Sequence, residues 1–168
     1  DLAGIGGWFQ IATELFAHMS NIKLLHVPYK GAAFALTDVI GGQVNLMVNT
    51  TIVAAPHVKS GRVRPLATTG AQRTATLPDV PTMDEAGVRG YEGNTWCGLG
   101  APARTPRAVV ARINREFQAV LGAPEVQQKL MDGGSVVTGG SPEQFLDILK
   151  TDLDKYGKLV RAVGIKGT

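Results

Sequence analysis

The sequence has few of the residues that build disulfides and metal centres. It contains one cysteine in 168 residues, Cys97, so no intramolecular disulfide can form. Its three histidines, His18, His26 and His57, are far apart and lack the spacing of metal ligands. We therefore expect neither a metal site nor a cofactor.

Charged and aromatic residues are also scarce. Charged residues make up 18% of the chain, against an average of about 25%, and aromatic residues make up 6%. The formal net charge is +3, and the densest basic cluster, Lys59, Arg62 and Arg64, falls in a predicted turn. Nucleic-acid binding typically needs a basic face with interleaved aromatic side chains. The sequence therefore argues against a nucleic-acid partner.

Long apolar runs are missing as well. None approaches the roughly 20 residues of a transmembrane helix, so we expect no insertion into a membrane. No signal peptide is visible either. Because the chain begins at Asp1 without a methionine, the missing signal peptide carries little weight.

Local catalytic motifs are absent too. The sequence has no G-x-S-x-G elbow, no H-E-x-x-H and no phosphate-binding loop. Cys97, beside Trp96 in a predicted strand, is expected to be a small buried hydrophobic residue rather than a nucleophile. Several acidic residues fall on predicted helix faces, where a solvated surface is the favoured interpretation: Glu116, Glu125, Asp147, Asp152 and Asp154. We expect no enzyme, although residues distant in sequence can still meet in a fold.

The first 70 residues alternate between helical and strand patterns. The apolar spacing predicts helices over 8–19, 32–42 and 52–61, and strands over 23–29, 43–48 and 63–69. This order is typical of an α/β fold with a mostly parallel sheet covered by helices. With 44% apolar residues, the chain can form one sizeable core or two small lobes.

The rest of the chain is predicted to be mainly helical. A capping box predicts a short helix over 82–87, and a strand followed by a turn is expected over 94–102. Longer helices are predicted over 105–122, 123–133 and 141–164, and the first and the last carry an apolar stripe. Either these helices pack on the first sheet, or they belong to a second lobe whose strands lie outside this sequence.

Three turns rich in hydrogen-bond donors stand at predicted helix starts. The first contains Gly4, Gly6, Gly7 and Trp8; the second contains Tyr29, Lys30, Gly31, Ala32 and Ala33; the third contains Asn49 and Thr50. Unpaired N–H groups at a helix N-terminus suit an anion, and one edge of an open α/β sheet is where ligands usually bind. The alternative for the glycine-rich turn is a plain loop, and the alternative for Lys30 is a solvated lysine in a turn. Together the turns favour a binder of small anions over a catalyst.

Five motifs in order carry a resemblance to a known family. They are VPYKGAAFALTDVIGGQVNLMV, SGRVRPLATT, LPDVPTMDEAG, WCGLGAPARTPRAVVARIN and AVGIK. Taken together, they resemble the Bug-type, TctC-like substrate-binding proteins of tripartite tricarboxylate transporters. The resemblance implies a type II periplasmic-binding-protein-like fold with two lobes and mostly parallel sheets. It places lobe 2 in residues 1–90 and the C-terminal part of lobe 1 in 91–168, with lobe 1 incomplete because an N-terminal segment is lacking.

The resemblance also implies a function. Such a protein is a periplasmic receptor that binds a dicarboxylate, tricarboxylate or acidic amino acid and delivers it to the membrane subunits of a transporter. This chain departs from the family pattern, because Gly7, Gln10 and Asn49 stand where a hydroxyl residue, a histidine and an aspartate are common. Two rivals remain open: a ligand-sensing module that docks a signalling partner, and an enzyme on the same scaffold.

Overall fold

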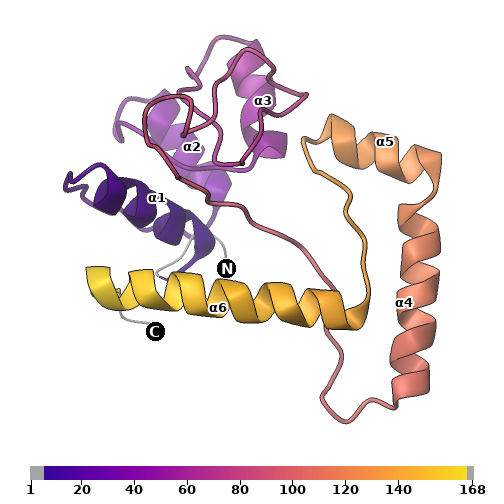
Figure 1. Ribbon diagram of the computed structural model, residues 1–168. Helices are drawn as coiled ribbons and strands as arrows, with labels where there is room; N and C mark the ends of the chain where they lie inside the picture. Colours follow the sequence, from indigo (N-terminus) through magenta and orange to yellow (C-terminus); the bar gives the residue numbers. More distant parts are fainter. Residues whose placement is uncertain (1–5, 166–168) are drawn as a thin grey trace. The chain divides into compact units, whose positions relative to one another are not determined.

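The computed structural model describes residues 6–165, which contain six helices (Figure 1). They are α1 (Trp8–Met19), α2 (Ala32–Ile40), α3 (Thr51–Lys59), α4 (Arg107–Leu121), α5 (Pro124–Asp132) and α6 (Pro142–Val163). The chain forms two compact units. Unit 1 comprises Asp1–Thr95 and Lys158–Thr168, and unit 2 comprises Trp96–Gly157. The assignment of residues 1–90 and 91–168 to two lobes remains a prediction.

The predicted long helices are confirmed, and their ends follow local sequence signals. At the start of α6, the Ser141 N–H donates to Gln144 Oε1 at 2.8 Å, and the Gln144 N–H donates to Ser141 Oγ at 3.2 Å. This reciprocal pair is the predicted capping box. Helix α5 has Pro124 at its first position, where no N–H is needed. Helix α4 begins later than expected, because Pro106 rather than Thr105 is its N-cap.

The four predicted strands are not found in residues 6–165. Segments 23–29, 43–48, 63–69 and 94–102 form no ladder, and the described part of the chain has a single isolated parallel bridge, between Thr68 and Thr82. Alternation of apolar residues sets which side chains share a face, but a strand also needs a neighbouring backbone about 4.8 Å away to bond. The parallel sheets therefore remain a prediction.

The predicted short helix over 82–87 is wrong, because the segment forms a turn. Its capping box nevertheless exists: the Thr82 N–H donates to Glu85 Oε2 at 2.8 Å, and the Glu85 N–H donates to Thr82 Oγ1 at 3.1 Å. Gly87 follows with φ +106, a conformation that ends a right-handed helix. The capping box of Thr82 and Glu85 therefore stabilises a single turn that does not continue into a helix.

The apolar core lies in unit 1. Its buried apolar residues are Ala12, Ala17, Leu36, Ala55, Val80, Tyr91 and Leu159. The Tyr91 hydroxyl donates to the Ala12 carbonyl at 2.9 Å, which ties the end of the unit's first segment to α1. Burial raises the pKa of Tyr91 to about 12.

Unit 2 is organised around one aromatic contact. The rings of Trp96 and Phe145 meet edge to face with centroids 4.9 Å apart, and the Trp96 indole N–H donates to Asp152 at 2.7 Å. The prediction that Cys97 is buried is wrong, because its side chain is exposed. The expected strand around it is not found in the described part of the chain.

Candidate functional site

The first predicted turn leads into α1. Gly4 lies outside the described residues. Gly6 has φ +75, a conformation that favours glycine, and its N–H donates to Gln10 Oε1 at 2.7 Å. Gly7 is buried and serves as the N-cap without a side-chain cap, and the half-buried Trp8 begins the helix. The N-cap residue therefore offers no side chain to the first-turn N–H groups of α1. The N–H of Gly6, by contrast, is bonded to the side chain of Gln10.

The second turn leads into α2. Gly31 is the N-cap, with φ 174 and no side-chain cap, and Ala32 and Ala33 are the first two helical residues. Lys30 is exposed. A φ of 174 is extended backbone that any residue adopts, and a Cβ built on Gly31 would lie 3.8 Å from Phe34 Cδ2, an ordinary contact. The fold itself does not require glycine at this position.

Tyr29, in the same turn, is engaged within the protein. Its hydroxyl donates to Asp38 Oδ2 at 2.7 Å. This hydrogen bond, followed by desolvation and the charge of Asp38, raises the pKa of Tyr29. Sequence reasoning missed Asp38, because nothing in a nine-residue separation indicates that the turn brings the two side chains together. With its proton committed to Asp38, the Tyr29 oxygen can still accept a hydrogen bond.

The third turn leads into α3. Thr50 is the N-cap, and its hydroxyl makes no cap hydrogen bond. Its N–H donates to Asn49 Oδ1 at 2.8 Å, and Asn49 Nδ2 lies 3.9 Å from Met47 Sδ. The amide of Asn49 is therefore turned toward its own neighbours.

The three turns all belong to unit 1, but their hydrogen bonds are local. Figure 1 shows α1, α2 and α3 in the indigo to magenta part of the chain, and α2 and α3 contact each other. The hydrogen bonds of Gly6, Tyr29 and Thr50 each have a partner within nine residues along the chain. Their convergence on one ligand remains a prediction, as do the individual site residues.

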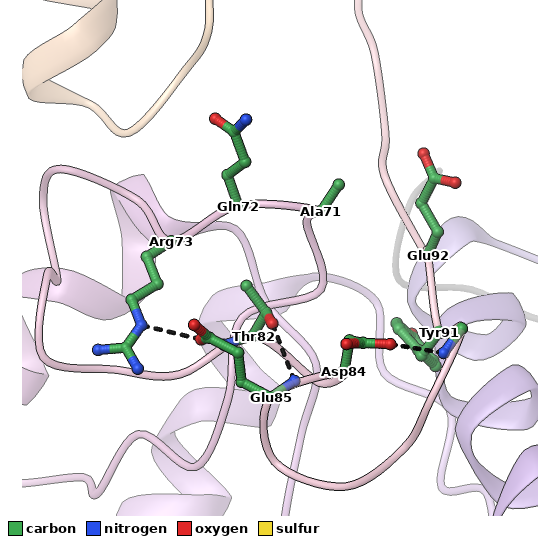
Figure 2. A pocket seen from close by; sticks show the side chains of 9 residues that line it. Ala71, Gln72, Arg73, Thr82, Asp84, Glu85, Tyr91 and Glu92 are labelled. Atoms are coloured by element: carbon green, nitrogen blue, oxygen red, sulfur yellow. Dashed lines mark hydrogen bonds and ion pairs between the residues drawn. The ribbon is translucent and has the colours of Figure 1, made fainter.

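A cavity of about 470 Å³ lies elsewhere in unit 1 (Figure 2). None of the predicted site residues lines this cavity. Its lining consists of Ala71, Gln72, Arg73, Thr82, Asp84, Glu85, Gly90, Tyr91 and Glu92.

Internal contacts occupy several of its charged groups. Arg73 Nε donates to Glu85 Oε2 at 2.8 Å, and the Gly90 N–H donates to Asp84 Oδ1 at 2.7 Å. The Thr82 N–H, with the Arg73 guanidinium as a second cause, lowers the pKa of Glu85. These contacts hold the loop that lines the cavity in place.

The described residues contain neither a candidate metal site nor a candidate membrane span. Residues 6–165 hold no group of three or more histidine, cysteine, aspartate or glutamate residues arranged to bind a metal ion. In the same range, no helix has both the length and the apolar character needed to cross a membrane.

Comparison with known proteins identifies the family. The model of the tripartite tricarboxylate transporter family receptor, TctC, matches residues 2–165. The chain belongs to this family. One relative, a UPF0065 protein in the tcbD-tcbE intergenic region of Pseudomonas sp. strain P51, is 39% identical over 94% of this chain and 47% of its own length. Another, in the clcB-clcD intergenic region of Pseudomonas knackmussii, is 35% identical over 94% of each chain.

Solved structures confirm the periplasmic-binding-protein fold of this TctC-family chain. It matches R. palustris Rpa4515 with adipate (TM-score 0.89, 35% identity), covering 97% of this chain and 55% of that one. It matches the periplasmic binding protein BugD (TM-score 0.86, 33% identity), covering 99% and 56%. MatC from Rhodopseudomonas palustris with bound malate gives a TM-score of 0.82 at 29% identity, covering 94% and 55%. The chain spans about half the length of most of these proteins, and its share of the fold is correspondingly partial.

Proposed function

We propose that this chain is the ligand-binding part of an extracytoplasmic solute receptor that binds a small organic carboxylate. The observation that carries the proposal is the set of helix starts in unit 1. The N-caps of α1, α2 and α3 are Gly7, Gly31 and Thr50, and none caps its helix through a side chain. The first-turn N–H groups and the positive end of each helix dipole suit a carboxylate.

The second turn makes the strongest contribution. Exposed Lys30 adds a positive charge beside the start of α2, and Gly31 leaves the helix N-terminus open to close approach. Tyr29 is held in place by Asp38. Adipate and malate, bound by two structural neighbours, are dicarboxylates of the size such a site would take.

The proposal extends to location and partner. As a TctC-family receptor, the protein would work in the periplasm and pass its ligand to the membrane subunits of a tripartite transporter. It would do so without catalysing a reaction. A ligand-sensing role and an enzymatic role remain rivals, and no observation in residues 6–165 favours either one.

A Gly31→Ala variant tests the proposal. The added methyl group fits the fold but fills space at the start of α2, so we expect unchanged thermal stability and about tenfold weaker carboxylate binding. Gly100→Ala is the matched control, because a Cβ there meets nothing within 4 Å and the residue lies in unit 2.

The measurement is a thermal-shift screen with mono-, di- and tricarboxylates, followed by calorimetry with the best ligand. A ligand that stabilises the parent chain and Gly31→Ala equally would show that the site lies elsewhere. No stabilisation by any acid, repeated on a full-length version of the receptor, would contradict carboxylate binding altogether.

A further inference from the structure

A side-chain hydrogen bond joins the second predicted turn to the body of α2. The Tyr29 hydroxyl, two residues before the Gly31 N-cap, donates to Asp38 Oδ2 at 2.7 Å. Asp38 comes six residues after Ala32, the first residue of α2, which corresponds to about 9 Å along the helix axis. The bond therefore ties the turn to the side of the helix, and both of its ends come from one short segment of the chain.

The backbone holds the same turn less closely. The Ala35 N–H donates to the Gly31 carbonyl at 3.5 Å, which is longer than the roughly 2.7–3.2 Å of an ordinary hydrogen bond. The corresponding first bonds of α1 and α3, to the carbonyls of Gly7 and Thr50, measure 3.1 and 3.0 Å. Helix α2 thus has the longest first bond of the three, and the Tyr29 hydroxyl supplies a shorter tie to the helix.

Asp38 is a firm anchor for this tie because its own backbone is held. Its carbonyl accepts the N–H of Gln43 at 2.8 Å and the N–H of Val44 at 3.3 Å. Between them and the helix the chain turns at Gly42, whose φ of +73 lies in the left-handed region that commonly ends helices. The carboxylate that receives the Tyr29 proton therefore stands on a fixed part of α2.

The bond also decides what Tyr29 can offer a ligand. A phenol has one proton to donate, and here that proton is directed at Asp38. The phenol oxygen keeps only its lone pairs, which do not attract a carboxylate. An anion at the start of α2 would therefore meet the exposed Lys30 and the first-turn N–H groups, and not the Tyr29 hydroxyl.

We propose that Asp38 is a positioning residue for carboxylate binding. Acting through Tyr29, it holds the turn that carries Lys30 and Gly31, so that the lysine and the first N–H groups of α2 face the ligand together. This inference rests on the proposed function and gives Tyr29 a supporting role. The charge of Asp38 alone would act in the opposite direction, because a nearby carboxylate repels an anionic ligand.

The first test examines the turn without a ligand. Asp38→Ala removes the acceptor, whereas Asp38→Asn keeps an acceptor oxygen and removes the charge. Amide hydrogen exchange measured by NMR reports the first helical bond of α2 through the Ala35 N–H. Asp38→Ala and Tyr29→Phe should each speed that exchange about fivefold, because one hydrogen bond fewer holds the turn. Asp38→Asn should leave it within about twofold, and the Ala54 N–H at the start of α3 should not change in any variant.

The second test measures binding by calorimetry, with malate, adipate and the best acid from the thermal-shift screen as probes. Asp38→Ala and Tyr29→Phe should each weaken binding about fivefold, and the double variant should bind no more weakly than either, because both changes remove one bond. Asp38→Asn should bind as tightly as the parent or slightly more tightly, since the bond remains and the opposing charge is gone.

Thr37→Ala is the matched control for both tests. The Thr37 hydroxyl donates to the Ala33 carbonyl at 3.0 Å, so it bonds within α2 and does not reach the turn before it. This variant should leave both the exchange of the Ala35 N–H and the dissociation constant within about twofold of the parent.

The outcomes separate the inference from its alternatives. If Tyr29 donated directly to the ligand, Asp38→Ala would free the phenol and tighten binding, which would overturn the proposal. Equal weakening by Asp38→Ala and Asp38→Asn would assign the effect to charge, and unchanged exchange at Ala35 in Asp38→Ala would show that the bond does not hold the turn; either result overturns it as well. A parent protein that binds no acid of the screen contradicts the proposed function and this inference with it, whereas undiminished binding by Asp38→Ala contradicts the inference alone.

Discussion

The hydrogen bond from the Tyr91 hydroxyl to the Ala12 carbonyl is expected to anchor α1 in unit 1, and its contribution to the free energy of unfolding can be measured by substitution. The Tyr91 ring is 3% exposed and Ala12 is fully buried, so both packing and the bond contribute to stability. Two substitutions separate these contributions. Tyr91→Phe removes the hydroxyl and keeps the ring, whereas Tyr91→Ala removes both.

The expected magnitudes differ clearly. Loss of the bond alone should lower the free energy of unfolding by about 1 kcal/mol. The cost is modest because Ala12 lies inside α1, where its carbonyl keeps the helical bond from the N–H four residues on. Tyr91→Ala should cost about 3–5 kcal/mol, because it also leaves a cavity in the core.

Urea unfolding followed by circular dichroism measures both changes. With a slope of about 2 kcal/mol per molar urea, the midpoint should fall by about 0.5 M for Tyr91→Phe and about 2 M for Tyr91→Ala. Tyr29→Phe serves as the control, because Tyr29 is only half-buried and its partner Asp38 stays accessible to water. If Tyr91→Phe were no more destabilising than Tyr29→Phe, the bond to Ala12 would not be an anchor.

Two further predictions concern alkaline pH and a helix cap. The pKa of Tyr91 is about 12 in the folded protein against an ordinary value of 10.0, so burial of the neutral phenol adds stability that is complete below pH 10 and lost as the pH rises through 12. The loss should total about 3 kcal/mol, measured as the fall in unfolding free energy with pH, and Tyr91→Phe should remove it. An unchanged slope in that variant would assign the loss to other groups. Ser141→Ala should lower stability by about 1 kcal/mol through loss of the α6 cap, detected as reduced helicity on heating. Ser135→Ala, an exposed serine outside any helix, should have no effect, and equal losses in both variants would contradict the capping argument.

The helices could be predicted from sequence because their signals are local. The Ser141 capping box and the proline at the start of α5 act within one helical turn, and apolar spacing of three and four residues marks each face. Family membership was predictable for a similar reason, because ordered motifs spread over nearly the whole chain carried the resemblance.

Contacts between distant residues were not predictable. The predicted strands are not found in residues 6–165, and pairing depends on a neighbouring backbone that alternation does not specify. The bond from Tyr29 to Asp38 crosses a turn, and the bond from Tyr91 to Ala12 spans 79 residues. The exposure of Cys97 likewise depends on which other segments pack around it.

Unit 1 is built from two stretches of the chain that are far apart in sequence, and this affects how it can fold during synthesis. Tyr91 emerges from the ribosome 79 residues after Ala12, which corresponds to roughly 4–16 s at ordinary translation rates. The core also includes Leu159, from the far end of α6, which is synthesised later still. Unit 1 therefore cannot complete its core until the second of its two segments has been made. Helix α1 is unanchored until Tyr91 emerges, and a chaperone that holds nascent apolar segments would find its substrate in that interval.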